Sequence, residues 1–316
     1  MPDWLKCSYK GKWINIADAQ VCSRKGLKTG VLNGLSVTII FGAGGQLGRE
    51  LRKIMPDAIG FAHSGSDHAF DIQNLRELEN AFTSNQPDVV INTSAMTDVD
   101  KCETDKSLAY SVNTLSVLNI ARLCRKYGSR LYHISTDYVF NGVEGNYKEC
   151  AVPDPINYYG FSKAMGDAFA YSYENSTIVR TSGIYGYKMN FPKFVYESLK
   201  AGKTVNAVKG YYSPIHAGAL AHAIAELVEY HEDVKGIINV AGVRISRMQL
   251  AHQIAIKFGL DAELISEIES FSGLKARRPY DSSLDISYSK GILKTDFFTL
   301  EHNMELLERS IVRENE

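Results

Sequence analysis

Two residues with the right types and spacing for proton transfer are Tyr159 and Lys163, four positions apart in the segment Tyr159-Gly160-Phe161-Ser162-Lys163. This spacing places two side chains on one face of a helix, one turn apart. Free tyrosine has a pKa of about 10 and exchanges its proton poorly at neutral pH. A lysine cation beside the ring favours the phenolate and lowers that pKa. The pair therefore predicts a tyrosine acid, Tyr159, tuned by Lys163.

A hydroxyl-rich segment, Ser135 to Phe140 with the sequence STDYVF, precedes this pair by the length of one loop. It follows the apolar run Leu131 to Ser135, so it lies at the carboxyl end of a predicted strand, where ligands of open α/β sheets bind. We expect Thr136, rather than Ser135, to orient a substrate carbonyl oxygen beside the tyrosine. Asp137 and Tyr138 are then predicted substrate contacts.

Three glycines, Gly42, Gly45 and Gly48, follow the apolar run Val37 to Phe41 and open a helical pattern. In this context a glycine triplet permits a tight turn, close approach of the backbone to a pyrophosphate, and close packing of helix on strand. The free N–H groups of the helix N-terminus favour phosphate. The loop predicts a dinucleotide, and Lys163 is placed to bond the nicotinamide ribose.

The predicted second strand ends at Ala62, and the residues that follow bear on the choice of cofactor. His63 and Ser64 come next, where an acidic residue would bind the ribose hydroxyls of NAD. With Arg49 as a candidate neighbour of a 2′-phosphate, the sequence favours NADPH, with NADH as the alternative. Asp71-Ile72 is typical of a pair at the adenine edge, although Asp71 also suits the N-cap region of the next helix.

Short apolar runs alternate with helical patterns along this part of the chain, and together they must position these groups. This alternation predicts a parallel sheet with right-handed crossovers, because both faces of the strands are apolar. The fold class expected is α/β, a doubly wound parallel (Rossmann) sheet with a smaller mixed C-terminal substrate lobe. The predicted strands are 37–41, 58–62, 89–93, 131–135, 177–181 and 237–241, and the predicted helices are 47–55, 74–82, 107–126, 159–172, 217–230 and 246–258.

The changes of pattern divide the chain into three parts. Residues 1–35 contain Trp4 and Trp13 but no periodicity, and we interpret them as an N-terminal extension of unknown role. Residues 36–182 are the predicted dinucleotide-binding Rossmann domain. Residues 183–316 form the predicted substrate-binding lobe, whose segments interleave with the sheet.

The composition excludes several other classes of protein. In 316 residues, 35 basic side chains nearly balance 36 acidic ones, so no broad basic field favours nucleic acid or an anionic membrane. No apolar run has the roughly 20 residues needed to span a bilayer. The five cysteines have irregular spacing, which argues against disulfides and structural zinc. We therefore expect a cytoplasmic protein without a metal, with a homodimer as the candidate assembly.

Six segments in order resemble the dTDP-4-dehydrorhamnose reductase family: FGAGGQLG, INTSAMTDVDKCE, HISTDYVFNG, NYYGFSKAMGD, VRTSGIYG and ARRPYDSSLD. The resemblance covers nearly everything from Val37 to the C-terminus. It implies NADPH-dependent reduction of a nucleotide-linked 4-keto-6-deoxysugar in deoxysugar biosynthesis, of the kind that converts dTDP-4-dehydrorhamnose to dTDP-rhamnose. It also implies that Thr136, Tyr159 and Lys163 are catalytic. The implied cofactor contacts are Gly45, Gln46, Leu47, Asp71, Ile72, Thr93, Ser94 and Ala95.

The basic residues near these segments suggest where a substrate is held. Arg180 and Arg278 are candidates to bind the diphosphate, since a planar guanidinium suits paired oxygens, but a structural ion pair fits each equally well. His216 fits packing better than catalysis. The chain departs from the family at Gly183, where the family carries a tryptophan in the sugar pocket, and at 211–218, where a G-x-P-T segment is replaced. Both departures bear on specificity for the sugar and nucleotide.

Two other functions suit the same scaffold. A nucleotide-sugar epimerase or dehydratase would retain its nicotinamide through purification, whereas a net reductase must release it. A non-catalytic regulatory subunit similar to the β subunit of methionine adenosyltransferase would co-purify with its enzyme. The complete set of Thr136, Tyr159 and Lys163 favours an enzyme over the regulatory subunit.

Overall fold

The computed structural model describes residues 6–9, 12–15, 36–64, 68–269 and 273–314. The chain divides into two units, residues 1–36 and 37–316. In the first unit, β1 (Lys6–Tyr9) and β2 (Lys12–Asn15) pair as an antiparallel hairpin. Trp13 belongs to β2, whereas Trp4 lies outside the described residues. The role of this extension stays open.

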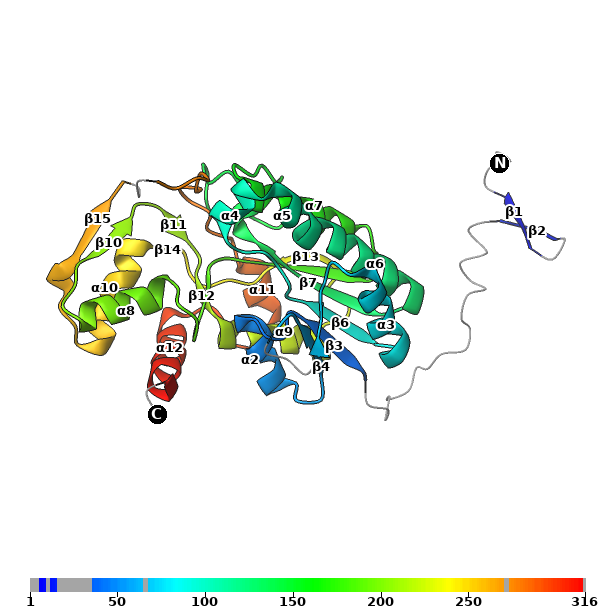
Figure 1. The fold of residues 1–316 in the computed structure, drawn as a ribbon, viewed down its shortest axis with the longest axis horizontal. Coiled ribbons are helices and arrows are strands. Elements are labelled where there is room, and N and C mark those ends of the chain that lie inside the picture. The colour runs from blue at the N-terminus through cyan, green and yellow to red at the C-terminus, as the bar shows by residue number, and fades with distance from the viewer. Residues whose placement is uncertain (1–5, 10–11, 16–35, 65–67, 270–272, 315–316) are drawn as a thin grey trace. The chain divides into compact units, whose positions relative to one another are not determined.

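A seven-stranded sheet forms the centre of the second unit, in the order β13-β8-β7-β6-β3-β4-β5 (Figure 1). Every neighbouring pair in it is parallel. The chain starts in the middle, proceeds to one edge and then returns to the other side, so the prediction of a doubly wound sheet is confirmed. The strands are β3 (Thr38–Phe41), β4 (Ile59–Ala62), β5 (His68–Ala69), β6 (Val89–Asn92), β7 (Arg130–Thr136), β8 (Ser176–Thr181) and β13 (Gly236–Asn239).

Helices cover both faces of this sheet, as the apolar strands require. Ile40 of β3 faces a core built with α2 (Gln46–Ile54) and α9 (Ala217–Tyr230). Its neighbours Ile39 and Phe41 face the opposite core, built with α3 (Leu75–Asn85), α6 (Ser116–Tyr127) and α7 (Tyr158–Tyr171). Alternate residues of one strand therefore enter two separate cores, and the sheet is held rigidly between them.

The helix predicted over 107–126 is interrupted by a π-helical turn. The segment forms α5 (Lys106–Tyr110), a π turn η2 (Ser111–Leu115) and then α6. Asn113 in this turn is buried, and its side chain accepts a hydrogen bond from the Met96 backbone N–H (2.9 Å) and donates one to the Met96 carbonyl (3.1 Å). We attribute the widened turn to these bonds, because insertions into the helical ladder commonly occur where side chains make such contacts.

Beyond residue 182 the chain both completes the sheet and builds a second core. Strand β13 joins the main sheet beside β8, and α9 covers it. The second core lies among α8 (Phe191–Lys200), α10 (Arg247–Phe258), α12 (Leu300–Glu314) and the parallel pair β10 (Val205–Val208) and β15 (Ile265–Ile268). Two further two-stranded sheets are formed by this part of the chain. In one, β9 (Ile184–Tyr185) pairs with β12 (Ile215–His216), and in the other, β11 (Tyr211–Tyr212) pairs with β14 (Ile245–Ser246). The short elements are α4 (Val99–Thr104), α11 (Ser287–Ile292) and the 3-10 turns η3 (Asp137–Val139) and η4 (Ala262–Leu264).

His216 has a structural place in this arrangement. Its Nδ1 accepts a hydrogen bond from the Gly218 N–H at the start of α9 (3.0 Å), and its Nε2 lies 3.0 Å from Ser310 Oγ. Burial lowers the pKa of His216 to about 4. A neutral imidazole that caps a helix agrees with the packing role expected from the sequence.

Candidate active site

Helix α7 brings Tyr159 and Lys163 to the carboxyl edge of the sheet. The side chain of Asn157 caps the helix by accepting a hydrogen bond from the Gly160 N–H (2.8 Å). The ring of Tyr159 lies edge-on to that of Tyr138, with the ring centres 5.8 Å apart. The predicted spacing on one helical face is therefore realised, and the pair stands directly beside the STDYVF segment.

A cavity of about 550 Å³ opens at this point. Its size is typical of a small-molecule site. Most of the residues that the sequence predicts for the site line it together: Gly45, Gln46, Leu47, Thr93, Ala95, Thr136, Asp137, Tyr138, Tyr159 and Lys163. The cofactor loop, the hydroxyl segment and the tyrosine–lysine pair thus share one space.

Hydroxyl groups surround the buried carboxylate of Asp137. It accepts hydrogen bonds from Ser182 Oγ (2.7 Å) and Ser282 Oγ (2.6 Å) and, through its other oxygen, from Thr136 Oγ1 (3.2 Å). Burial raises the pKa of Asp137, and these donors oppose the rise. Because three protein hydroxyls already donate hydrogen bonds to the Asp137 carboxylate, we infer that its main structural role is to hold the Thr136 side chain in place. The predicted contact of Asp137 with substrate remains a prediction.

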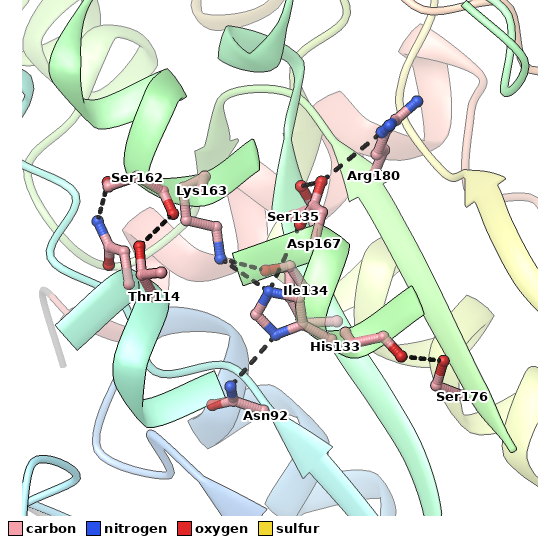
Figure 2. Close-up of polar contacts among 12 residues, drawn as sticks. Asn92, Thr114, His133, Ile134, Ser135, Ser162, Lys163, Asp167, Ser176 and Arg180 are labelled. Carbon is pink, nitrogen blue, oxygen red and sulfur yellow. Dashed lines mark hydrogen bonds and ion pairs between the residues drawn. The ribbon is translucent and has the colours of Figure 1, made fainter. Parts of the chain in front are cut away.

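Lys163 lines the cavity but is almost completely buried, with 2% of its surface exposed. Its Nζ donates to the carbonyl of Ile134 (2.7 Å) and lies 3.4 Å from His133 Nε2 (Figure 2). Burial lowers the pKa of Lys163 to about 8, while the negative charge of Asp167 opposes the shift. The protonation state of Lys163 therefore depends on the buried groups around its side chain.

His133 is the nearest of these groups. The Asn92 amide is oriented because its oxygen accepts a hydrogen bond from the Ser94 N–H (3.1 Å), so its nitrogen faces His133 Nδ1 at 3.2 Å. An amide nitrogen only donates, which leaves the imidazole proton on Nε2. That atom is 3.6 Å from Asp167 Oδ1. Burial and the charge of Lys163 hold the pKa of His133 well below its usual value, so the ring is neutral.

Arg180 belongs to the same buried cluster and does not line the cavity. Its Nε lies 3.9 Å from Asp167 Oδ2 (Figure 2). Its Nη1 donates to the Glu149 carbonyl (3.2 Å), and its guanidinium lies over the Phe140 ring. Asp167 also accepts a hydrogen bond from Ser135 Oγ (2.6 Å). Of the two roles that the sequence left open for Arg180, binding of the diphosphate or a structural ion pair, the structure shows the ion pair with Asp167.

Arg278 also has a carboxylate partner outside the cavity lining. Its guanidinium lies 3.3 Å from Asp100 at the start of α4. Asp100 also accepts hydrogen bonds from the backbone N–H groups of Lys275 and Ala276, at 3.0 and 2.9 Å. The carboxylate therefore anchors the ARRP segment beside the site.

The glycine loop has the geometry that a dinucleotide requires. Gly42 has a φ of +81°, and a Cβ there would lie 2.5 Å from Thr93 Oγ1, so only glycine fits. Gly45 is the N-cap of α2 and provides no side-chain hydrogen bond, which leaves N–H groups of the first turn free for phosphate oxygens. Gly48 is buried within that helix. The residues present therefore fit a bound dinucleotide.

Five predicted cofactor residues do not line this cavity: Gly42, Gly48, Asp71, Ile72 and Ser94. Asp71 is exposed after β5, and its carboxylate accepts a hydrogen bond from the Gln73 N–H (3.0 Å). Asn74, not Asp71, caps α3. Their roles with a cofactor stay predictions.

Several lining residues were missed, some because they lie inside the six family segments without being predicted contacts, and others because they come from segments without a recognisable motif. Gln46 ties one of these segments to the glycine loop: its amide donates to the Ile184 carbonyl (3.0 Å) and accepts from the Lys188 N–H (2.9 Å). The departures at Gly183 and at 211–218, which includes Tyr212, pointed to this wall of the site. The missed residues are Thr97, Val99, Ile134, Ser135, Thr181, Ser182, Gly183, Ile184, Lys188, Met189, Asn190, Phe191, Tyr212 and Arg247.

Within the described residues, no three histidine, cysteine, aspartate or glutamate side chains are grouped as a metal site would need. In that same part of the chain, no helix has the length and apolar character to cross a membrane. Cys102, Cys124 and Cys150 are free thiols.

Comparison with known proteins adds a family and relatives. The protein family described as "RmlD substrate binding domain" matches residues 37–311. The chain is 32% identical over 256 residues to the spore coat polysaccharide biosynthesis protein SpsK of Bacillus subtilis, covering 79% of this chain and 89% of the relative. It is 36% identical over 196 residues to a dTDP-4-dehydrorhamnose reductase of Aggregatibacter actinomycetemcomitans, covering 60% of this chain and 67% of the relative.

Solved structures agree with this relationship. A hypothetical dTDP-4-dehydrorhamnose reductase from Sulfolobus tokodaii is 49% identical, with a TM-score of 0.80 over 84% of this chain and 97% of its own. The dTDP-4-dehydrorhamnose reductase of Bacillus anthracis, solved in complex with NADP, is 28% identical, with a TM-score of 0.78 over 88% of this chain and 99% of its own.

Proposed function

The chain belongs to the RmlD substrate binding domain family, and from this premise we propose that it is an NADPH-dependent reductase of a nucleotide-linked 4-keto-6-deoxysugar. The observation that carries the proposal is the meeting of Thr136, Tyr159 and Lys163 with the glycine loop around one cavity. Relatives named dTDP-4-dehydrorhamnose reductase support the substrate class. The product would be the 4-hydroxy sugar of the dTDP-rhamnose type.

In the proposed reaction, Tyr159 holds the proton that the substrate oxygen receives. Burial raises the pKa of Tyr159, and a hydrogen bond with Thr136 opposes the rise, so the phenol keeps its proton at neutral pH until a carbonyl accepts it. A bound reduced nicotinamide would supply hydride to the carbonyl carbon. The phenolate that remains on Tyr159 is stabilised by the Lys163 cation and regains its proton from solvent.

Residues at the glycine loop would hold the cofactor. Gly45, Gln46, Leu47, Thr93 and Ala95 line the cavity between α2 and the ends of β3 and β6. We further propose NADPH over NADH, since the residues directly after β4 are His63 and Ser64, without a carboxylate for a ribose diol. The NADP complex of the Bacillus anthracis relative supports this choice.

The test is oxidation of NADPH, followed by absorbance, with a dTDP-4-keto-6-deoxysugar as substrate. We expect Tyr159→Phe to lower kcat by roughly a hundredfold to ten-thousandfold, the usual contribution of a positioned acid. Tyr171→Phe is the matched control, because Tyr171 ends the same helix and is 61% exposed. Equal rates in wild type and Tyr159→Phe would show that Tyr159 is not the proton donor.

A further inference from the structure

A pair of residues on the cavity wall, Tyr212 and Arg247, has no part in the mechanism above. Tyr212 ends β11 and pairs with Ile245 of β14. Arg247 is the first residue of α10, directly after Ser246, which caps that helix through reciprocal hydrogen bonds with Gln249. The short sheet and the cap fix both side chains next to each other, and the guanidinium carbon lies 4.6 Å from the centre of the Tyr212 ring.

Arg247 differs from the other arginines near the site because it forms no ion pair within the described residues, although its charge opposes the burial that raises the pKa of Asp137. Arg244 bonds Asp281 at 2.7 Å, while Arg180 and Arg278 lie near Asp167 and Asp100. Among the described residues, no carboxylate lies within ion-pair distance of Arg247, although the side chain is half-buried and lines the cavity. The carboxylate of Asp137 in the same wall is already occupied by hydroxyl donors. A desolvated guanidinium facing a cavity is stabilised by an anion with paired oxygens.

Tyr212 adds a second group without a partner at the same place. The residue is 7% exposed, and its buried hydroxyl makes no hydrogen bond within the described part of the chain. Buried polar groups of this kind are uncommon and call for an explanation. Gly183 also lines the cavity here, and a Cβ on it would lie 3.2 Å from Tyr212 Cε2. Glycine at 183 therefore leaves the Tyr212 ring as the aromatic surface of this wall.

Tyr138 relates the reacting end of the cavity to Arg247. The ring of Tyr138 contacts the ring of Tyr159, and the positive charge of Arg247 acts on the Tyr138 hydroxyl, where it opposes the burial that raises the pKa of Tyr138. In a nucleotide sugar, the ring separates a ketone at one carbon from a phosphate at the anomeric carbon. A ketone at Tyr159 would thus place that phosphate toward Arg247.

We propose that Arg247, with Tyr212 beneath it, holds the diphosphate of the substrate in this chain, in place of the expected Arg180 and Arg278. The inference rests on the proposed function for the identity of the ligand, a nucleoside diphosphate linked to a sugar. It assigns the binding of phosphate to the part of the cavity wall formed by β11 and α10.

Binding of dTDP, measured by calorimetric titration of the full chain, tests this directly. We expect Arg247→Met to weaken dTDP binding by roughly tenfold to a hundredfold, the range for hydrogen bonds to charged groups. Tyr212→Phe should weaken it by about two- to tenfold. Arg122→Met, an exposed arginine on α6, is the control and should bind dTDP like wild type. Binding of NADP⁺ and the melting temperature verify that each variant is folded.

Turnover separates this assignment from the proposed function. In the assay with dTDP-ketosugar, Arg247→Met should raise KM with little change in kcat, because Arg247 would contact the diphosphate of the substrate and not the reacting carbon. Equal dTDP affinity in wild type and Arg247→Met would overturn the assignment while leaving the reductase intact. Loss of dTDP binding in the variant, with no turnover of ketosugar by wild type, would support the phosphate site and reject the reductase. Wild type that binds no dTDP would reject the phosphate site.

Discussion

At the scale of single residues, the charge of Lys163 is the most sensitive quantity in the site. Its pKa is lowered to about 8 because the side chain is buried, against 10.5 for the free group. We expect kcat to fall as the pH rises through this value, because the neutral amine no longer stabilises the Tyr159 phenolate. Between these two values the unfolded chain binds more protons than the folded chain, so the free energy of unfolding should rise with pH over that window. The pH profile of kcat and urea unfolding at several pH values measure the two effects.

Asp167 should shift that profile in a defined direction. Its negative charge raises the pKa of Lys163, and Asn would keep an acceptor for the Ser135 hydroxyl while removing the charge. Asp167→Asn is therefore expected to move the alkaline loss of kcat to lower pH. The exposed substitution Asp57→Asn serves as the control. An unchanged profile in Asp167→Asn, with a folded protein, would mean that the carboxylate does not control the charge of Lys163.

At the scale of elements, the packing of α7 against the π turn positions the catalytic lysine. Gly166, one turn after Lys163, is buried, and a Cβ on it would lie 2.3 Å from the Asn113 carbonyl oxygen. Gly166→Ala should therefore lower the free energy of unfolding by about 1–3 kcal/mol, through overpacking, and reduce kcat by displacing Lys163. In Gly291→Ala, on α11, the Cβ meets nothing within 4 Å.

Gly291→Ala is the control, and it should raise the free energy of unfolding by about 0.5–1 kcal/mol, because alanine restricts the unfolded chain and favours the helix. Denaturant unfolding of both variants gives the comparison. If Gly166→Ala were as stable as wild type, the close contact between α7 and the π turn would not be a constraint on the fold.

The whole molecule shows which features a sequence can predict. The spacing of Tyr159 and Lys163 and the position of Gly42 are local patterns, and both appear in the structure as expected. Arg180 and Arg247 are the same residue type, and only tertiary packing buries one beside Asp167 and turns the other toward the cavity. Asp167 was detectable, since it follows Lys163 by four positions and so shares its helical face. The π turn at Asn113 depends on the distant backbone of Met96, which periodicity does not contain.

Cofactor binding should be visible in the stability of the whole molecule. The cavity is lined by the glycine loop and by the segment around Ile184 and Lys188, and the Gln46 side chain bonds the two together. These segments are distant in the sequence, so a dinucleotide would bind only the folded chain. At a concentration a hundredfold above its Kd, NADP⁺ should raise the free energy of unfolding by about 2.7 kcal/mol. Thermal unfolding with NADP⁺ or NAD⁺ measures this increase.

Arg49 provides the test of preference between the two dinucleotides. It is exposed on α2, and its guanidinium carbon lies 4.9 Å from the centre of the Tyr187 ring, which leaves it available at the predicted 2′-phosphate position. We expect Arg49→Met to weaken binding of NADP⁺ by roughly tenfold, since a hydrogen-bonded charge pair is lost, and to leave NAD⁺ binding unchanged. Equal weakening of both dinucleotides would place Arg49 at a part of the cofactor that they share. Stronger stabilisation of the wild-type protein by NAD⁺ than by NADP⁺ would instead reverse the proposed preference, because the 2′-phosphate would then gain no binding energy from the exposed residues His63 and Ser64 after β4.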